Sequence, residues 1–507
     1  MRKGIRAFTV AAASVAVVAA SLVIRADVTP ASQAGEIQLQ LAHEFFLEGR
    51  YLDALDAYRN ALNGVAPASV RAARTGIVQS SLRVAEFASA RTEAEALLAL
   101  SPRDPSALAL HGDALWASGL FEEAEARYRD AVAIQPELAR GLHGVARALA
   151  ARSQLPEALT EAQAALRHAP RDLEAHHTIG AIYERMHRFE DAAAAYENYV
   201  NLLPNTDRSE KADWARAEVR FLRAFEQRVP FEMEPGAADR TYTVDFRLVK
   251  DKIVVRAKVN KGSFLDFVVD TGAESTIVSG PLAQKLGITP LTVTLSAGVG
   301  NAGLRGLQMA RIDSLELGEL KMRNVPCLIK DPPMRNLPVK EAESLSPLAL
   351  GFSMLIDYQA KKLTFGRHLD DEASDQQLSL RMHRLATVRG MVDGRHTANF
   401  VVDTGGEVIS ISRATATAIQ RPVPTPKIGL KVFGSSGWDR DAFLLPGVNL
   451  AFSTIKYDNF PVVVLNLNAP SALLGFELGG IVGHRFLSKY RVGIDLERSV
   501  LRLKSLS

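Results

Sequence analysis

The sequence has almost no cysteine: Cys327 is the only one among 507 residues. A single cysteine excludes an internal disulfide, and it excludes a metal site built from several thiolates. In an exported protein the fold would therefore have to be held together by packed cores alone.

An excess of one charge sign is also missing. The chain has 60 Lys and Arg against 57 Asp and Glu, a net charge of +3, with no block of basic residues in its body. This balance argues against nucleic acid as a partner. With 47 % hydrophobic and 23 % charged residues the composition is that of a globular protein.

Several motifs of enzyme chemistry are absent. The eleven histidines show no HExxH or other paired ligand spacing, so we expect no metal. No G-x-S-x-G nucleophile elbow occurs either. The stretch GVGNAG at residues 298–303 fits G-x-G-x-x-G by its letters. A dinucleotide site would need a helix directly after it, whereas a strand-like stretch follows, so we expect no nucleotide and no other cofactor.

Charge is absent from residues 7–24, which follow Arg2, Lys3 and Arg6. An uncharged stretch of 18 residues is long for a signal peptide and short for a membrane span. The basic flank should stay on the cytoplasmic side. Residues 1–30 are therefore predicted to be a signal anchor or a signal peptide. We favour an uncleaved anchor, which would place the rest of the chain on the periplasmic or cell-surface side, membrane-anchored; cleavage would make it secreted.

A 34-residue period runs through the first half of the chain. It is carried by two series: Pro102, Pro136, Pro170, Pro204, and Ala90, Ala124, Ala158, Ala192. Small residues let the two helices of a repeat approach closely, and proline ends the second helix before the next unit.

This pattern resembles the tetratricopeptide repeat family, although Leu108 replaces the tryptophan typical of its first helix. The resemblance implies an all-α solenoid over residues 36–228, with residues 208–228 as a polar-faced capping helix. A plain helical bundle is the alternative, but it imposes no such period. The concave face of the solenoid is expected to recruit a protein partner or substrate.

Strand patterns begin after residue 230, and they occur twice. FVVDTG stands at residues 267–272 and returns at residues 400–405, 133 positions later. The surrounding stretches 253–288 and 386–419 also align. We predict two homologous lobes, residues 236–368 and 376–507, joined by a polar linker over residues 368–377.

Each lobe reads strand, Asp-Thr-Gly turn, strand, helix, and later an apolar pair ending in Gly. This resembles the aspartic peptidase superfamily, and most closely its retropepsin-like branch, because each lobe is only about 130 residues long. The resemblance implies a mainly-β, two-lobed fold, a monomeric pseudo-dimer with its active site where the lobes meet, and a polypeptide substrate.

Asp270 and Asp403 are the predicted catalytic pair. Two close carboxylates cannot both ionise, so they would share one proton and activate a water. The resemblance gives supporting roles to four neighbours: Thr271, Gly272, Thr404 and Gly405. The threonines would cross-link the lobes, and the glycines would let backbone N–H groups approach the carboxylates. Glu274 and Glu407 follow the two turns. They are expected to be solvated; the alternative is that they shift the protonation of the aspartate pair.

Two glycine-rich hairpins are predicted to fold over the cleft as flaps. Their candidate residues are Gly298, Gly300 and Gly303 in lobe 1 and Gly434, Gly437 and Trp438 in lobe 2. Plain exposed hairpins are the alternative.

The lobes depart from symmetry near their ends. Aligning LALG at residues 348–351 with GIVG at residues 480–483 leaves lobe 1 six residues short before Asp357. We therefore expect its last turn to differ. A non-enzymatic scaffold, with decayed lobes that only bind peptide, is the alternative to an aspartic endopeptidase.

Overall fold

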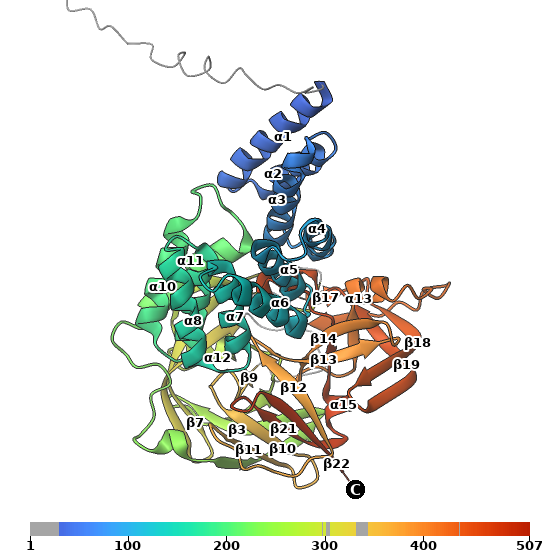
Figure 1. Cartoon of the computed structure of the whole chain (residues 1–507). Helices are drawn as coiled ribbons and strands as arrows, with labels where there is room; N and C mark the ends of the chain where they lie inside the picture. Colours follow the sequence, from blue (N-terminus) through green and yellow to red (C-terminus); the bar gives the residue numbers. More distant parts are fainter. Residues whose placement is uncertain (1–29, 297, 301–304, 331–342, 435–436, 507) are drawn as a thin grey trace, which may run out of the picture.

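The computed structural model describes residues 30–296, 298–300, 305–330, 343–434 and 437–506 (Figure 1). Within these residues no helix is both long and apolar enough to cross a membrane. The predicted anchor over residues 7–24 and the flap residue Gly303 lie outside the described residues.

From residue 30 to residue 223 the structure has eleven α-helices, arranged as five antiparallel pairs and a last single helix. They are α1 (Pro30–Leu47), α2 (Tyr51–Leu62), α3 (Val70–Arg83), α4 (Phe87–Leu100), α5 (Pro105–Ala117), α6 (Phe121–Ile134), α7 (Ala139–Ala151), α8 (Leu155–His168), α9 (Leu173–Arg185), α10 (Phe189–Leu202) and α11 (Glu210–Arg223). The predicted solenoid is confirmed: the pairs stack one after another, and the first helices project as an arm away from the lobes (Figure 1).

Small residues allow the close helix packing that the period predicts. A Cβ atom added at Gly112 would lie 2.6 Å from the ring of Tyr128, and one at Gly180 would lie 2.7 Å from the ring of Tyr196. These distances are too short for any real Cβ. Each glycine of the first helix therefore makes room for the tyrosine 16 positions later in the second helix.

Lobe 1 is mainly β. Its elements are β1 (Tyr242–Asp245), β2 (Arg247–Val249), β3 (Lys252–Val259), β4 (Phe264–Val269), β5 (Thr276–Ser279), α12 (Gly280–Lys285), β6 (Pro290–Ser296), β7 (Arg305–Leu317), β8 (Leu320–Lys330), β9 (Ser344–Leu345), β10 (Ser353–Asp357) and β11 (Lys362–Gly366).

Lobe 2 repeats this order. Its elements are β12 (Gln376–Met382), β13 (Ala386–Val392), β14 (His396–Val402), β15 (Ser410–Ser412), α13 (Arg413–Ala418), β16 (Val432–Gly434), β17 (Gly437–Asp439), β18 (Phe443–Phe452), β19 (Ile455–Leu465), α14 (Asn468–Leu474), β20 (Gly480–Val482), α15 (His484–Leu487), β21 (Tyr490–Asp495) and β22 (Val500–Ser505).

The central strand pairings of the two lobes correspond, although β6 joins the main sheet of lobe 1 and β16 and β17 form a separate two-stranded sheet. β4 pairs in parallel with β9, as β14 does with β20. β5 pairs in parallel with β8, as β15 does with β19, and both lobes close with a long hairpin, β7–β8 or β18–β19. The duplication read from the sequence is therefore also a duplication of topology.

One sheet joins the lobes. β10 of lobe 1 pairs antiparallel with β21 of lobe 2, so that Leu355 faces Gly493. The apolar side chains of both lobes form one continuous core that includes Phe267 and Phe400, neither of which is exposed. Continuous burial of this kind holds the two lobes as one body.

The sequence alignment of the lobe ends is wrong by five residues. Val269 pairs with Leu345 and Val402 pairs with Val482, so the counterpart of Gly483 is Ser346 rather than Gly351. The LALG stretch instead forms the turn that corresponds to α15: the Leu350 N–H donates to the Ser346 carbonyl as the Leu487 N–H does to that of Gly483, both at 3.2 Å. Lobe 1 is then only one residue short. A serine in place of the expected glycine concealed this register.

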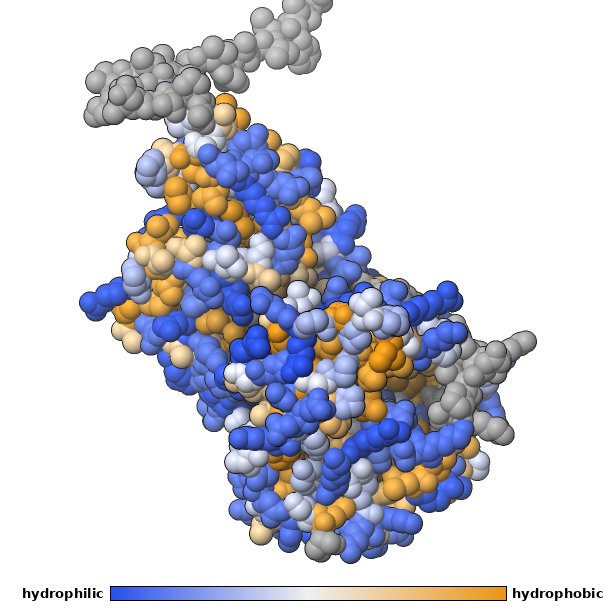
Figure 2. All heavy atoms as spheres, turned by 90° about the vertical axis from the view of Figure 1, so that its right-hand side faces the viewer, coloured by the Kyte–Doolittle hydropathy of each residue, from blue (hydrophilic) through white to orange (hydrophobic). Residues whose placement is uncertain are grey.

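The solenoid packs directly against the lobes. Arg381 of β12 pairs with Glu122 of α6 at 2.8 Å, and Arg389 of β13 pairs with Glu123 at 2.7 Å. The rings of Phe121 and Phe476 lie 5.2 Å apart in an apolar cluster shared by α5–α7 and lobe 2. Figure 2 shows hydrophobic patches among hydrophilic residues on this face of the molecule.

The predicted capping helix α11 has a polar exposed face, which carries Asp213, Arg220 and Arg223. Its other face buries Trp214, Phe221 and Leu222. These side chains belong to a cluster that also contains Met309 of β7 and Leu473 of α14. α11 therefore connects the solenoid to both lobes through its apolar face.

Candidate active site

Asp270 and Asp403 each follow directly after a buried strand, β4 and β14. The Asp270 N–H donates to the Leu345 carbonyl at 2.9 Å, and the Asp403 N–H donates to the Val482 carbonyl at 3.1 Å. Since β4 and β14 are central strands of their lobes, both aspartates are held on rigid elements. Each keeps some solvent exposure, whereas Thr271 and Thr404 behind them are buried.

The two carboxyl groups meet across the lobes. The Gly272 N–H donates to Asp270 Oδ1 at 3.0 Å, and the Gly405 N–H donates to Asp403 Oδ1 at 2.7 Å. A Cβ at Gly272 would lie 2.6 Å from Asp403 Oδ1, and one at Gly405 would lie 2.5 Å from Asp270 Oδ1. Glycine is required at both positions because the opposite carboxyl group occupies the space of a side chain.

The threonines cross-link the lobes. The hydroxyl group of Thr271 donates to the Val402 carbonyl at 2.6 Å and accepts from the Thr404 N–H at 3.0 Å. The hydroxyl group of Thr404 donates to the Val269 carbonyl at 2.7 Å and accepts from the Thr271 N–H at 3.1 Å. These four buried bonds fix the relative position of the two turns.

The proximity of the carboxyl groups alters their protonation. Burial, the negative charge of Asp403 and a hydrogen bond to its side chain raise the pKa of Asp270 to about 7. The Gly272 N–H and the charge of Lys252 act in the opposite direction. At acidic to neutral pH the pair therefore retains a proton.

Lys252 is a site residue that the sequence reasoning missed. It begins β3, and its ammonium group donates a hydrogen bond to the Gly405 carbonyl of the other lobe. The residue 133 positions later is Leu385, so lobe 2 offers no equivalent cation. A lysine in lobe 1 where the matching position of lobe 2 has a leucine was the feature of the sequence that could have pointed to Lys252.

The acids after each turn have different surroundings. Glu407 is exposed and pairs with Arg485 of its own lobe at 2.7 Å, in keeping with a solvated site. Glu274 is half-buried and forms an ion pair with Arg384 of lobe 2. The expectation of a solvated side chain is therefore wrong for Glu274.

Both predicted hairpins are present. β6 pairs with β7 up to Ser296 and Arg305, and β16 pairs with β17, with Phe433 opposite Trp438. The tips touch: a Cβ at Gly434 would lie 2.3 Å from the Val299 carbonyl oxygen. Gly298 and Gly300 belong to the lobe 1 tip. Trp438 is 37 % exposed, and a flap role for these hairpins stays a prediction.

No cluster of His, Cys, Asp and Glu side chains within the described ranges could hold a metal ion. The protein groups around the aspartate pair are the Gly272 and Gly405 N–H donors, the threonines and Lys252. This set can hold one proton between two carboxyl groups and hydrogen-bond an oxygen placed between them.

Residues 255–354 and 388–478 match the sequence model of the aspartyl protease family. Each lobe has the aspartyl protease fold. The two matched segments correspond to the two lobes, and together they contain both Asp-Thr-Gly turns. No curated protein matches the chain.

The helical part resembles solved repeat proteins. A TPR protein of Thermus thermophilus is 21 % identical over 34 % of this chain and 93 % of its own, with a TM-score of 0.30. PilF of Pseudomonas aeruginosa is 19 % identical over 38 % and 86 %, with a TM-score of 0.27. YrrB, described as a TPR protein with an unusual peptide-binding site, is 18 % identical over 35 % and 94 %, with a TM-score of 0.23.

Proposed function

We propose that the protein is an aspartic endopeptidase in which Asp270 and Asp403 together activate the water that attacks a peptide bond. The observation that carries the proposal is the cross-lobe approach of the two carboxyl groups, which excludes any side chain at Gly272 and Gly405. The raised pKa of Asp270 supports a shared proton.

In this mechanism the ionised carboxylate takes a proton from the bound water while the water oxygen attacks the carbonyl carbon. The protonated carboxyl group hydrogen-bonds the carbonyl oxygen, giving a tetrahedral gem-diol. Proton transfer to the amide nitrogen then lets the C–N bond break. The threonine cross-link keeps the carboxyl groups at a fixed separation, so little reorganisation is needed at the moment of reaction.

The substrate of this proposal is an extended polypeptide, bound by main-chain pairing between the turns and the hairpins. An extracytoplasmic location is part of the same proposal, supported by the uncharged stretch 7–24 behind a basic flank. The solenoid would present substrate or a partner protein to the cleft, which is supported by its direct packing on both lobes.

A digest of a denatured, unstructured protein between acidic and neutral pH tests the proposal. The wild-type chain should produce new peptide termini, whereas Asp270→Asn and Asp403→Asn should each reduce the rate by at least about 10³-fold. An inert wild-type chain, or undiminished cleavage by either variant, would contradict the proposal.

A further inference from the structure

A cavity of about 1420 Å³ lies between the solenoid and the lobes. One wall consists of helices of the repeats and α11, and the opposite wall consists of lobe residues, among them Glu274, Thr276, Thr294 and Arg384. This volume is larger than that of most small-molecule sites, so several residues of a peptide would fit.

The cavity continues from one end of the proposed cleft. Glu274, Ser275 and Thr276 line it, and Glu274 stands two positions after Gly272 of the Asp-Thr-Gly turn. Thr294 and Ser296 of the β6 strand, which leads to the lobe 1 hairpin, line it as well. A polypeptide held between that turn and that hairpin would therefore extend into the cavity.

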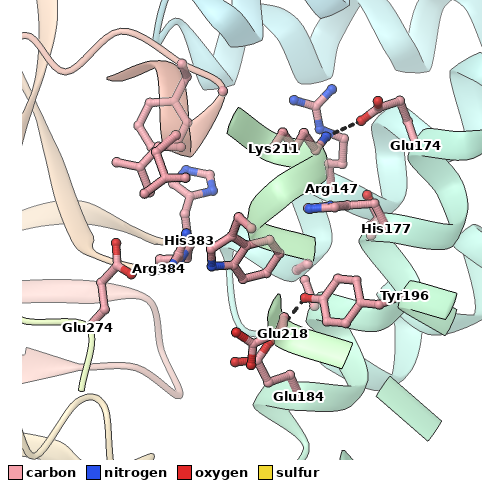
Figure 3. A pocket seen from close by; sticks show the side chains of 18 of the residues that line it. Arg147, Glu174, His177, Glu184, Tyr196, Lys211, Glu218, Glu274, His383 and Arg384 are labelled. Atoms are coloured by element: carbon pink, nitrogen blue, oxygen red, sulfur yellow. Dashed lines mark hydrogen bonds and ion pairs between the residues drawn. The ribbon is translucent and has the colours of Figure 1, made fainter. Parts of the chain in front are cut away.

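Acidic side chains gather at this part of the cavity. Glu184 of α9 and Glu218 of α11 lie side by side on the solenoid wall, with Arg384 and Glu274 on the lobe wall (Figure 3). The guanidinium group of Arg384 lies 4.7 Å from the centre of the Trp214 ring and pairs with Glu274. Three carboxyl groups thus share one cation.

Glu218 is the member of this group that accepts no hydrogen bond within the described residues. Its side chain lines the cavity, the residue is only 3 % exposed, and no hydrogen-bond donor among the described residues reaches its carboxyl group. By contrast, Glu184 accepts a hydrogen bond from the Tyr196 hydroxyl at 3.1 Å. Burial and the charge of Glu184 raise the pKa of Glu218 well above its usual range. A buried carboxyl group without a partner is costly unless a ligand supplies one.

We propose that Glu218 and Glu184 form a subsite for a basic side chain, Lys or Arg, of the bound polypeptide. An ammonium or guanidinium group there would pair with the Glu218 carboxyl group, which would release its proton to solvent as the pair forms. The alkyl stem of the basic side chain would pack on the aromatic wall that includes Trp214 and Tyr196. The inference rests on the proposed function, since the occupant is the substrate of the aspartate pair.

The test is a binding selection that needs no cleavage. Full-length Asp403→Asn protein is immobilised and incubated with a random decapeptide library whose amino termini are acetylated, and captured peptides are sequenced. Acetylation leaves side chains as the main source of positive charge. We expect Lys and Arg together to be enriched about tenfold at one position, the order given by a desolvated charge pair. Absence of enrichment in this protein would overturn the proposal without any further variant.

Glu218→Gln in the same background should abolish the enrichment, and Glu184→Gln should weaken it. The matched control is Glu197→Gln, on the surface of α10 and paired with Arg223; it should leave enrichment unchanged. Enrichment that persists in Glu218→Gln would overturn the assignment. A parallel library without acetylation shows whether the occupant is a peptide amino terminus instead of a basic side chain. A preference for free amino termini over Lys and Arg would also contradict the assignment.

Failure of the subsite proposal and failure of the proposed peptidase function give different results. If the wild-type chain cleaves peptides with no preference for basic residues, the peptidase assignment stands and the subsite is wrong. If Asp403→Asn captures basic peptides that the wild-type chain never cleaves, the subsite stands and the peptidase assignment is wrong.

Discussion

Thr271 and Thr404, 133 residues apart in the chain, donate and accept hydrogen bonds with each other's turns in a symmetric way. Each hydroxyl group accepts from the other threonine's N–H and donates to the carbonyl oxygen two residues before that threonine. The lobes are therefore joined directly behind the aspartates, so the geometry of the pair depends on groups that touch no substrate.

Replacing Thr271 by Val should lower the free energy of unfolding by about 2 to 4 kcal/mol, because the Val402 carbonyl and the Thr404 N–H would be left buried and unpaired. Chemical denaturation measures this loss. Thr417→Val is the matched control, since its hydroxyl group is exposed and bonds only to the Arg413 carbonyl within α13. Equal effects of the two substitutions would argue against the cross-link.

Activity should fall as the pH rises through about 7, the value to which the pKa of Asp270 is raised, because the shared proton is then lost.

The stability of the folded protein should also depend on the protonation of Asp270. Its folded pKa lies above the unfolded one, so the folded protein binds an extra proton between about pH 4 and pH 7, and stability decreases over that range as pH rises. Asp270→Asn should remove this contribution to the decrease of stability with pH. Denaturation across pH 4–8 tests it; an unchanged slope would contradict the assignment.

Lys252→Met should raise the pKa of Asp270 further, because it removes a cation that lowers it. The alkaline limb of the pH–rate profile should shift to higher pH. Lys285→Met at the end of α12 is the control and should leave the limb in place. A shift toward lower pH in Lys252→Met would show that Lys252 acts on the pair in some other way.

Docking of the solenoid on the lobes should depend on Phe121, whose ring lies 4.5 Å from that of His383 and 5.2 Å from that of Phe476. Phe121→Ala should destabilise the protein by about 3 to 5 kcal/mol. Hydrogen exchange should also speed up in α14. Leu100→Ala, at a side chain 52 % exposed, serves as control. Unchanged exchange in α14 would mean that this cluster does not hold the lobes.

The internal repeats made much of the fold and the aspartate pair predictable from the sequence. Identical FVVDTG hexapeptides located the aspartates, and the 34-residue period located the helix pairs, because both patterns follow from repeated packing requirements. The lobe 1 terminus was misread because Ser346 occupies the glycine position and LALG imitates the expected motif. Lys252 and the Glu184–Glu218 subsite depend on contacts between distant segments, which no local pattern encodes. The contact of the apolar face of α11 with the lobes depends on distant segments in the same way.

The most direct measurement is an unbiased peptide-library digest in H₂¹⁸O with the wild-type chain, Asp270→Asn and Asp403→Asn. The account predicts cleavage by the wild-type chain alone, with ¹⁸O in each new carboxyl terminus. Equal cleavage by all three proteins, or none by the wild-type chain from acidic to neutral pH, would contradict it.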